Sequence, residues 1–161
     1  MKKQFIFLLF IMGILSTAFL MYIKFQKDMI KDLNSRLLKF KKYYQLYNVW
    51  IQNKRMGLSI SKNIIKKGYS KIAIYGNGEV GCRLYEELKG TEVQVAFFID
   101  KIANDMEMQH DENIPVIGIA GIKKDLDIDA VVITTINIFD EIMSNLNSIV
   151  TCDIISIEEL L

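Results

Sequence analysis

The chain has 161 residues, which is room for one domain and an extension, and 51% of them are hydrophobic. The net charge of +1 is uneven: residues 1–71 hold 15 Lys and Arg against Asp28 and Asp32, a net +13, whereas residues 72–161 hold 5 against 17, a net −12. This acidic part argues against nucleic acid as its partner, because phosphate backbones are bound by clustered positive charge.

An uncharged stretch of 19 residues, Phe5 to Ile23, follows Lys2 and Lys3. As a helix it would reach about 28 Å, close to the hydrocarbon thickness of a bilayer. Ser16-Thr17-Ala18 would pass as the cleavage site of a signal peptide, but the apolar run continues well beyond it. We therefore expect an uncleaved membrane anchor over residues 1–23. The excess of Lys and Arg after this span predicts a single-pass protein of the cell membrane, with its C-terminal domain in the cytoplasm.

Residues 24–57 are expected to form a helical stalk, with Gly57 as its break. Its apolar residues recur at alternating spacings of three and four, which predicts a parallel coiled coil and a homodimer through residues 30–51. Two alternatives are a helix that lies on anionic lipid through its lysines and a helix that folds back on its own domain. The residues of this heptad stripe are Ile30, Leu33, Leu37, Phe40, Tyr44, Tyr47 and Ile51.

The domain proper is expected over residues 58–161. Ser59 or Ser61 can cap a short helix through Ile64 and Ile65, and Gly68 would end it.

The three glycines Gly76, Gly78 and Gly81 have the spacing G-x-G-x-x-G. They follow an apolar strand over residues 72–75 and open a helix whose inner face includes Val80. The first glycine allows the tight turn, the second lets backbone approach a pyrophosphate, and the third lets the helix pack closely on the sheet. The amides at the start of the helix then face an anion.

A second strand, Val93 to Ile99, ends at Asp100, 19 positions beyond Gly81. Dinucleotide-binding proteins place an acid there to accept a hydrogen bond from a ribose hydroxyl. Lys101 leaves open whether the ribose is free or phosphorylated, and Glu79 could satisfy the helix dipole in place of a phosphate. The alternative is that the glycines only make the turn, Asp100 caps the strand and the site is empty.

The remaining elements complete an α/β domain. We expect a polar loop over residues 100–113 containing His110, strands over 114–118, 130–135 and 152–156, a helix over 138–146 and a terminal helical turn. Strands alternating with helices predict a Rossmann-like five-stranded parallel sheet of order 3-2-1-4-5, preceded by a transmembrane helix and the long helical stalk. The hydroxyls of Thr134 and Thr135 would face the ligand crevice. The candidate ligand-binding residues are Gly76, Asn77, Gly78, Glu79, Val80, Gly81, Asp100, Lys101, Thr134 and Thr135.

No catalytic or metal site is predicted. Tyr85 and Lys89 have the Tyr-x-x-x-Lys spacing of short-chain dehydrogenases, but they directly follow the glycines instead of lying far downstream, so we interpret them as an ordinary helix face. His110 has no Cys or His neighbour, and Cys82 and Cys152 are read as reduced, buried residues. Whether the chain is an enzyme stays open, although a stand-alone enzyme is not expected.

Residues 70–161 resemble a bacterial group in their glycine turn, in Phe97-Phe98-Ile99-Asp100, in Ile114-Pro115-Val116-Ile117-Gly118 and in residues 129–134. They are similar to the small Rossmann domain at the N-terminus of sugar O-acyltransferases. A similar domain precedes the nucleoside-diphosphate-sugar epimerase or dehydratase module of membrane-anchored capsule and exopolysaccharide enzymes. In the acyltransferases this domain binds the nucleotide part of a sugar substrate, a role that the resemblance gives to Gly76, Asn77, Gly78, Gly81, Asp100 and Thr134.

The 161 residues contain neither the left-handed helix of the acyltransferases nor an epimerase module, so the resemblance implies nucleotide recognition more than catalysis. The leading hypothesis is a membrane-anchored cytoplasmic module that binds NAD(P) or a nucleotide-sugar and is accessory to surface polysaccharide synthesis, with polysaccharide-biosynthesis enzymes as partners. One alternative is an NAD(H)-sensing regulatory domain that acts through the stalk. Another is a degenerate Rossmann domain that serves only for interaction.

Overall fold

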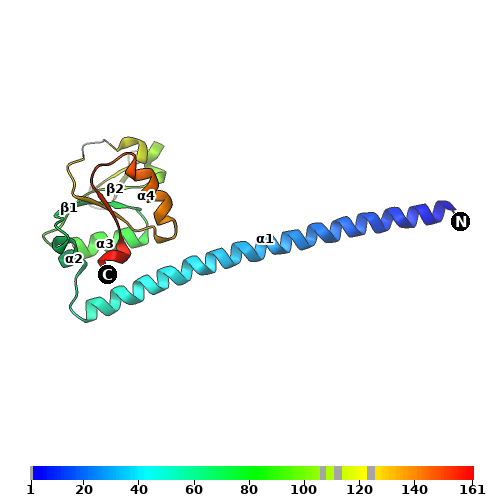
Figure 1. Cartoon of the computed structure of the whole chain (residues 1–161), viewed down its shortest axis with the longest axis horizontal. Coiled ribbons are helices and arrows are strands. Elements are labelled where there is room, and N and C mark those ends of the chain that lie inside the picture. The colour runs from blue at the N-terminus through cyan, green and yellow to red at the C-terminus, as the bar shows by residue number, and fades with distance from the viewer. Residues whose placement is uncertain (1, 106–107, 111–113, 123–125) are drawn as a thin grey trace. The chain divides into compact units, whose positions relative to one another are not determined.

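The computed structural model describes residues 2–105, 108–110, 114–122 and 126–161 (Figure 1). It forms two compact units, Met1–Lys41 and Lys42–Leu161. The first unit and the start of the second belong to one helix, α1 (Lys2–Arg55), which contains a stretch long and apolar enough to cross a membrane. Within this first unit the four residues of the heptad stripe, Ile30, Leu33, Leu37 and Phe40, are 55–69% exposed, and their part in a homodimer stays a prediction.

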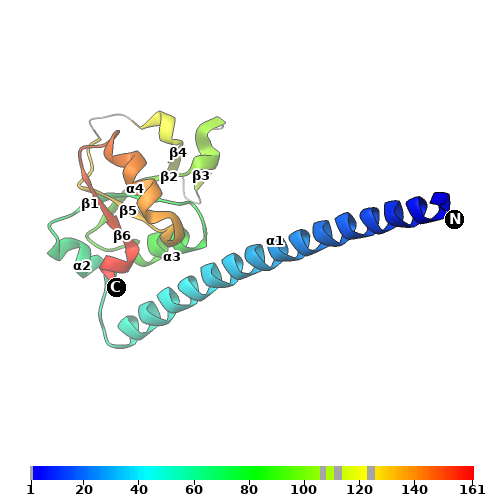
Figure 2. The same cartoon turned by 45° about the vertical axis from the view of Figure 1, so that its right-hand side comes forward.

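The second unit is built on a six-stranded sheet of order β3-β4-β2-β1-β5-β6 (Figure 2). Five of its strands are parallel: β1 (Lys71–Tyr75), β2 (Gln94–Ile99), β4 (Ile114–Ile117), β5 (Ala130–Ile133) and β6 (Asp153–Ser156). Numbered along the chain, these five have the order 3-2-1-4-5, so the predicted Rossmann-like topology is confirmed.

The sixth strand was not expected. His110, which the sequence places in a polar loop, belongs to β3 (Met108–His110), and β3 pairs antiparallel with β4 at the edge of the sheet. The prediction of a loop there was wrong. A polar three-residue strand has too few positions to show an alternating pattern, and it is defined by pairing with the otherwise free edge of β4.

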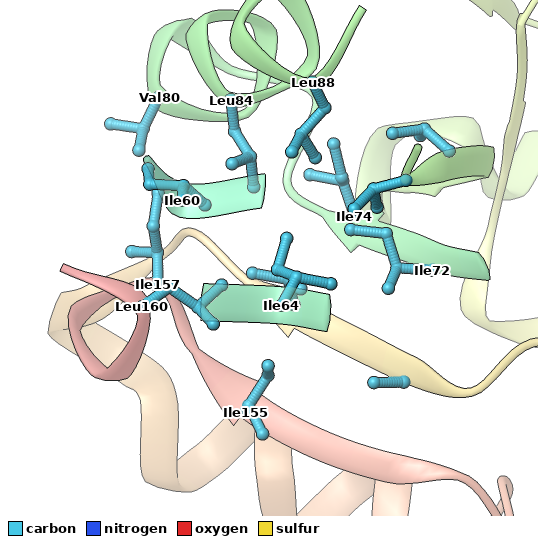
Figure 3. Packing of buried hydrophobic residues seen from close by; sticks show 14 of the residues in the cluster. Ile60, Ile64, Ile72, Ile74, Val80, Leu84, Leu88, Ile155, Ile157 and Leu160 are labelled. Carbon is cyan, nitrogen blue, oxygen red and sulfur yellow. The ribbon is translucent and has the colours of Figure 1, made fainter. Parts of the chain in front are cut away.

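Helices cover both faces of the sheet. On one face lie α2 (Ile60–Lys66), α3 (Glu79–Leu88) and the 3₁₀ turn η5 (Ile157–Leu160), and on the other lies α4 (Phe139–Asn147). Figure 3 shows the first of these two layers, where side chains of α3 point toward Ile60 and Ile64 of α2 and toward Ile72 and Ile74 of β1.

Short turns connect these layers as the sequence indicates. Gly57 follows α1 at a φ of +75° and Gly68 follows α2 at +93°, a backbone region that favours glycine. After α2 the amide of Gly68 donates to the carbonyl of Ile65, and that of Tyr69 donates to Ile64, which is the double hydrogen bond of a Schellman motif.

The last turns of α1 are part of the domain core. Leu46 and Trp50 are 4% and 5% exposed and belong to the same apolar cluster as α2, α3 and β1. The indole Nε1 of Trp50 donates to Glu87 Oε2 at 2.7 Å, and Lys54 Nζ lies 3.1 Å from the same oxygen. Residues 42–55 therefore pack on their own domain. This agrees with the alternative in which the stalk helix folds back on the domain.

This packing uses a face of α1 that differs from the heptad stripe. Tyr44 and Ile51 of the stripe are 60% and 57% exposed, whereas Tyr47 is half-buried and stacks on Trp50 with ring centroids 6.1 Å apart. Only Tyr47 is common to the stripe and to the face that packs on the domain.

We expect Trp50→Ala to lower the free energy of unfolding by about 3–5 kcal/mol, because it leaves a cavity in the core and removes a partner of Glu87. The matched control Tyr44→Ala, on the exposed face of the same helix, should change it by about 0.5 kcal/mol or less. Urea denaturation of the full chain in detergent measures both. Equal effects of the two substitutions would show that residues 42–55 are not part of the domain core.

Candidate functional site

The glycine turn joins β1 to α3 at the carboxyl end of the sheet. Gly76 has a φ of +102°, and a Cβ placed on it would lie 2.7 Å from Thr134 Oγ1 and 2.9 Å from Thr135 Oγ1. The turn therefore requires glycine at this position for two reasons. The backbone has a positive φ, and the threonine hydroxyls after β5 leave no room for a Cβ.

Gly81 lies in the first turns of α3, against the turn that precedes the helix. A Cβ on Gly81 would lie 2.0 Å from the carbonyl oxygen of Gly76 and 3.3 Å from a methyl group of Ile74. No side chain fits in this space, so Gly81 is what allows α3 to approach β1 so closely. Both glycines thus have structural roles that the motif predicts.

Gly78 differs from the other two. Its φ of −96° and ψ of −172° are open to any residue. Among the described residues other than its chain neighbours, no atom lies within 4 Å of a Cβ placed on it. As the N-cap residue of α3 it makes no side-chain cap, a position at which Ser, Asp or Asn would stabilise the helix more. The described part of the fold therefore does not require a glycine at this position.

Asp100 follows β2 and holds the turn in place. Its Oδ2 accepts from the amide of Asn77 at 2.8 Å, and its Oδ1 accepts from the amide of Ile102 at 3.0 Å. The carboxylate that the sequence assigns to a ribose hydroxyl therefore already accepts two backbone hydrogen bonds. Each oxygen keeps a second lone pair, so a ribose hydroxyl can still donate to it.

Thr134 and Thr135 follow β5, the neighbour of β1 in the sheet. Thr134 is 3% exposed, and its hydroxyl donates to the carbonyl of Tyr75 at 2.8 Å, so it serves the turn rather than the crevice. Thr135 is half-buried, with its Oγ1 close to Gly76. The structure therefore brings the glycine turn together with Asp100, Thr134 and Thr135.

The charged candidates lie at the edge of this group. Glu79 is exposed in the first turn of α3, where its negative charge is favoured by the helix dipole. Lys101 is exposed after Asp100, and Val80 is buried in the core and offers only its backbone. Burial raises the pKa of Tyr75 at the end of β1, and the charges of Asp100 and Glu141 raise it further. Among the described residues, no three His, Cys, Asp or Glu side chains gather as metal ligands.

Sequence reasoning missed two contributors to this region. Asn137, in the turn η4 (Ile136–Ile138) after β5, is half-buried. Tyr43 of α1 lies near it: burial raises the pKa of Tyr43, and a hydrogen bond with the Asn137 side chain opposes that increase. Asn137 lies two positions after Thr135, so the end of β5 already marked this stretch of the sequence. No sequence signal indicated a contribution from α1.

This fold and its glycine turn define a Rossmann-like α/β domain. A family model described as C2185-like, N-terminal, matches residues 68–155, more than half of the chain, and the chain belongs to this family. No curated protein and no solved structure gives a significant match.

We expect Gly81→Ala to lower the free energy of unfolding by about 2 kcal/mol or more, because the new Cβ meets the carbonyl of Gly76. Gly78→Ser should leave it unchanged or slightly higher, since serine is a preferred N-cap residue. Urea unfolding followed by circular dichroism compares them. A Gly78→Ser variant as unstable as Gly81→Ala would mean that Gly78 is also required by the fold.

Proposed function

We propose that the chain is a membrane-anchored module that binds a nucleotide or a nucleotide-sugar at the glycine turn. The observation that carries the proposal is Gly78, the one glycine of the motif that neither its backbone angles nor its neighbours require. A diphosphate that approaches this backbone and the first amides of α3 gives a physical reason for a residue without a side chain.

The proposed setting is the cytoplasmic face of the cell membrane. The apolar stretch of α1 is long enough for a single span, and the lysines that follow it favour a cytoplasmic C-terminal side. Nucleotides and nucleotide-sugars are available in that compartment. The likeness to the small Rossmann domain of sugar O-acyltransferases and of capsule enzymes supports a role beside the enzymes of surface polysaccharide synthesis.

An NAD(H)-sensing regulatory domain is the second candidate. It is favoured by the packing of α1 on α3, since α3 begins at the glycine turn and carries Glu87, the partner of Trp50 and Lys54. A ligand that shifts the start of α3 would thereby act on the helix that leads to the proposed membrane span.

The test is the melting temperature of the full chain in detergent micelles with NAD(H), NADP(H), UDP-sugars, CMP- and CDP-sugars and coenzyme A. A ligand at about 100 times its dissociation constant adds about 2.7 kcal/mol, which is on the order of 10 °C for a domain of this size. The full chain is needed because Leu46 and Trp50 complete the core.

The control is Gly78→Asp, which retains a favoured N-cap residue but places a negative charge and bulk where the diphosphate would lie. We expect this variant to fold as stably as the wild type and to lose the thermal shift. A shift with nucleotide-sugars supports the first candidate, and a shift with NADH alone supports the second. If the folded wild type responds to no compound, the site is degenerate and both candidates fail.

A further inference from the structure

The heptad stripe of α1 carries large apolar side chains that the described part of the domain does not cover. Six of its seven residues are 55–69% exposed, namely Ile30, Leu33, Leu37, Phe40, Tyr44 and Ile51. The face of α1 that packs on the domain is formed by Leu46 and Trp50 instead. Soluble surfaces rarely expose apolar side chains in one repeating row, so the stripe calls for a partner.

The spacing of the stripe favours a second helix as this partner. Its residues alternate at three and four positions over three repeats of seven, the pattern by which two helices pack knobs into holes. None of its seven positions carries a charge, and the lysines and the arginine between Lys24 and Lys42 all lie at other positions. A helix can therefore cover the stripe without burying an unpaired charge.

A lipid surface does not match the course of the helix. α1 has no break between Lys2 and Arg55, so the helix that leaves the proposed span continues along its own axis. Within the first unit, Phe40 lies 17 residues beyond Ile23, the last residue of the apolar run, which is about 26 Å of helix. The stripe thus extends away from the hydrocarbon layer instead of lying along it.

A groove in the second unit continues the stripe onto the domain. It has a volume of about 250 Å³ and is lined by residues of α1 and α3. Tyr47 and Ile51, the last two residues of the stripe, line its α1 side. Its charged side chains form two ion pairs, at 2.7 and 3.1 Å, which are Arg83–Glu86 and Lys54–Glu87. Since these charges are paired with one another, the groove can receive an uncharged helix face.

One like-charge contact acts against such a pairing. In a parallel coiled coil Arg36, which directly precedes Leu37 of the stripe, faces Lys41 of the other helix. Asp32 Oδ2 lies 2.9 Å from Arg36 Nε and offsets part of this repulsion. The uncharged stripe, rather than its flanks, therefore has to supply the attraction.

We propose that a second copy of this chain packs in parallel against the heptad stripe of α1 and into the groove beside Tyr47 and Ile51. The interface is symmetric, so each copy contributes the same stripe and the same groove. Anchoring in one membrane makes the two helices parallel and raises their local concentration, which compensates for a coiled coil of only three heptads. The dimer rests on the proposed membrane span and is independent of nucleotide binding.

The first experiment is disulfide crosslinking of the full chain in phosphatidylcholine vesicles, with Cys82 and Cys152 replaced by alanine. A single cysteine is introduced by Leu37→Cys in the stripe or, as the matched control, by Lys39→Cys on another face of the helix. A disulfide needs Cα atoms within about 7 Å, which only the stripe position provides in the dimer. We expect at least a fivefold higher yield of crosslinked dimer from Leu37→Cys.

Equal yields from the two variants overturn the proposal, and so does the absence of crosslinking in both. In the second case, quenching of a fluorophore on the Leu37→Cys variant by brominated lipid would assign the stripe to a lipid surface.

The second experiment measures the dissociation constant of the dimer by energy transfer between labelled full-length chains as the vesicles are diluted with lipid. Ile51→Asp places a charge in the stripe and the groove, and it should raise this constant tenfold or more. Gln52→Asp, on the exposed face beside it, should leave the constant within twofold of the wild type. Circular dichroism checks that both variants fold, as expected because both positions are exposed. A dimer that Ile51→Asp does not weaken is held elsewhere, and the proposal then fails.

Discussion

The close approach of α3 to β1 is the constraint on which the rest of the domain depends. It requires that residue 81 have no side chain, because a Cβ there would lie 2.0 Å from the carbonyl of Gly76. With the helix at this distance, Val80, Leu84 and Leu88 reach the face of the sheet and are buried. The same approach sets the shape of the turn, so the geometry that stabilises the core also leaves the open space beside Gly78.

The second feature is the share of α1 in the domain. Leu46 and Trp50 cover the same face of the sheet as α3, and Glu87 accepts a hydrogen bond from the indole while it pairs with Lys54. Asn53 adds a hydrogen bond from its side-chain amide to the carbonyl of Leu161. The helix that carries the apolar span therefore ends as part of the folded domain, in contact with Glu87 in the last turn of α3.

Within the candidate site, two side chains hold the glycine turn in place. Thr134 and the carboxylate of Asp100 are hydrogen-bonded to the turn itself, so they hold its shape. At Gly78, by contrast, a Cβ would meet open space among the residues that the structure describes, so the fold does not use this residue for packing. The structure therefore gives Thr134 and Asp100 a role in positioning the turn.

The sequence by itself determined the parallel sheet, its strand order and the positions of the turns, because these follow from local signals: apolar runs of strand length, helical spacing and glycines at chain reversals. It also named Gly76, Gly78 and Gly81. Only the tertiary structure decided that β3 adds an antiparallel edge and that Asp100 accepts from the turn. It alone decided that Leu46 and Trp50, not the heptad stripe, form the main contact of α1 with the domain. The reason is that α1 carries apolar residues on more than one face, and periodicity alone does not select the face that a partner distant in sequence will cover.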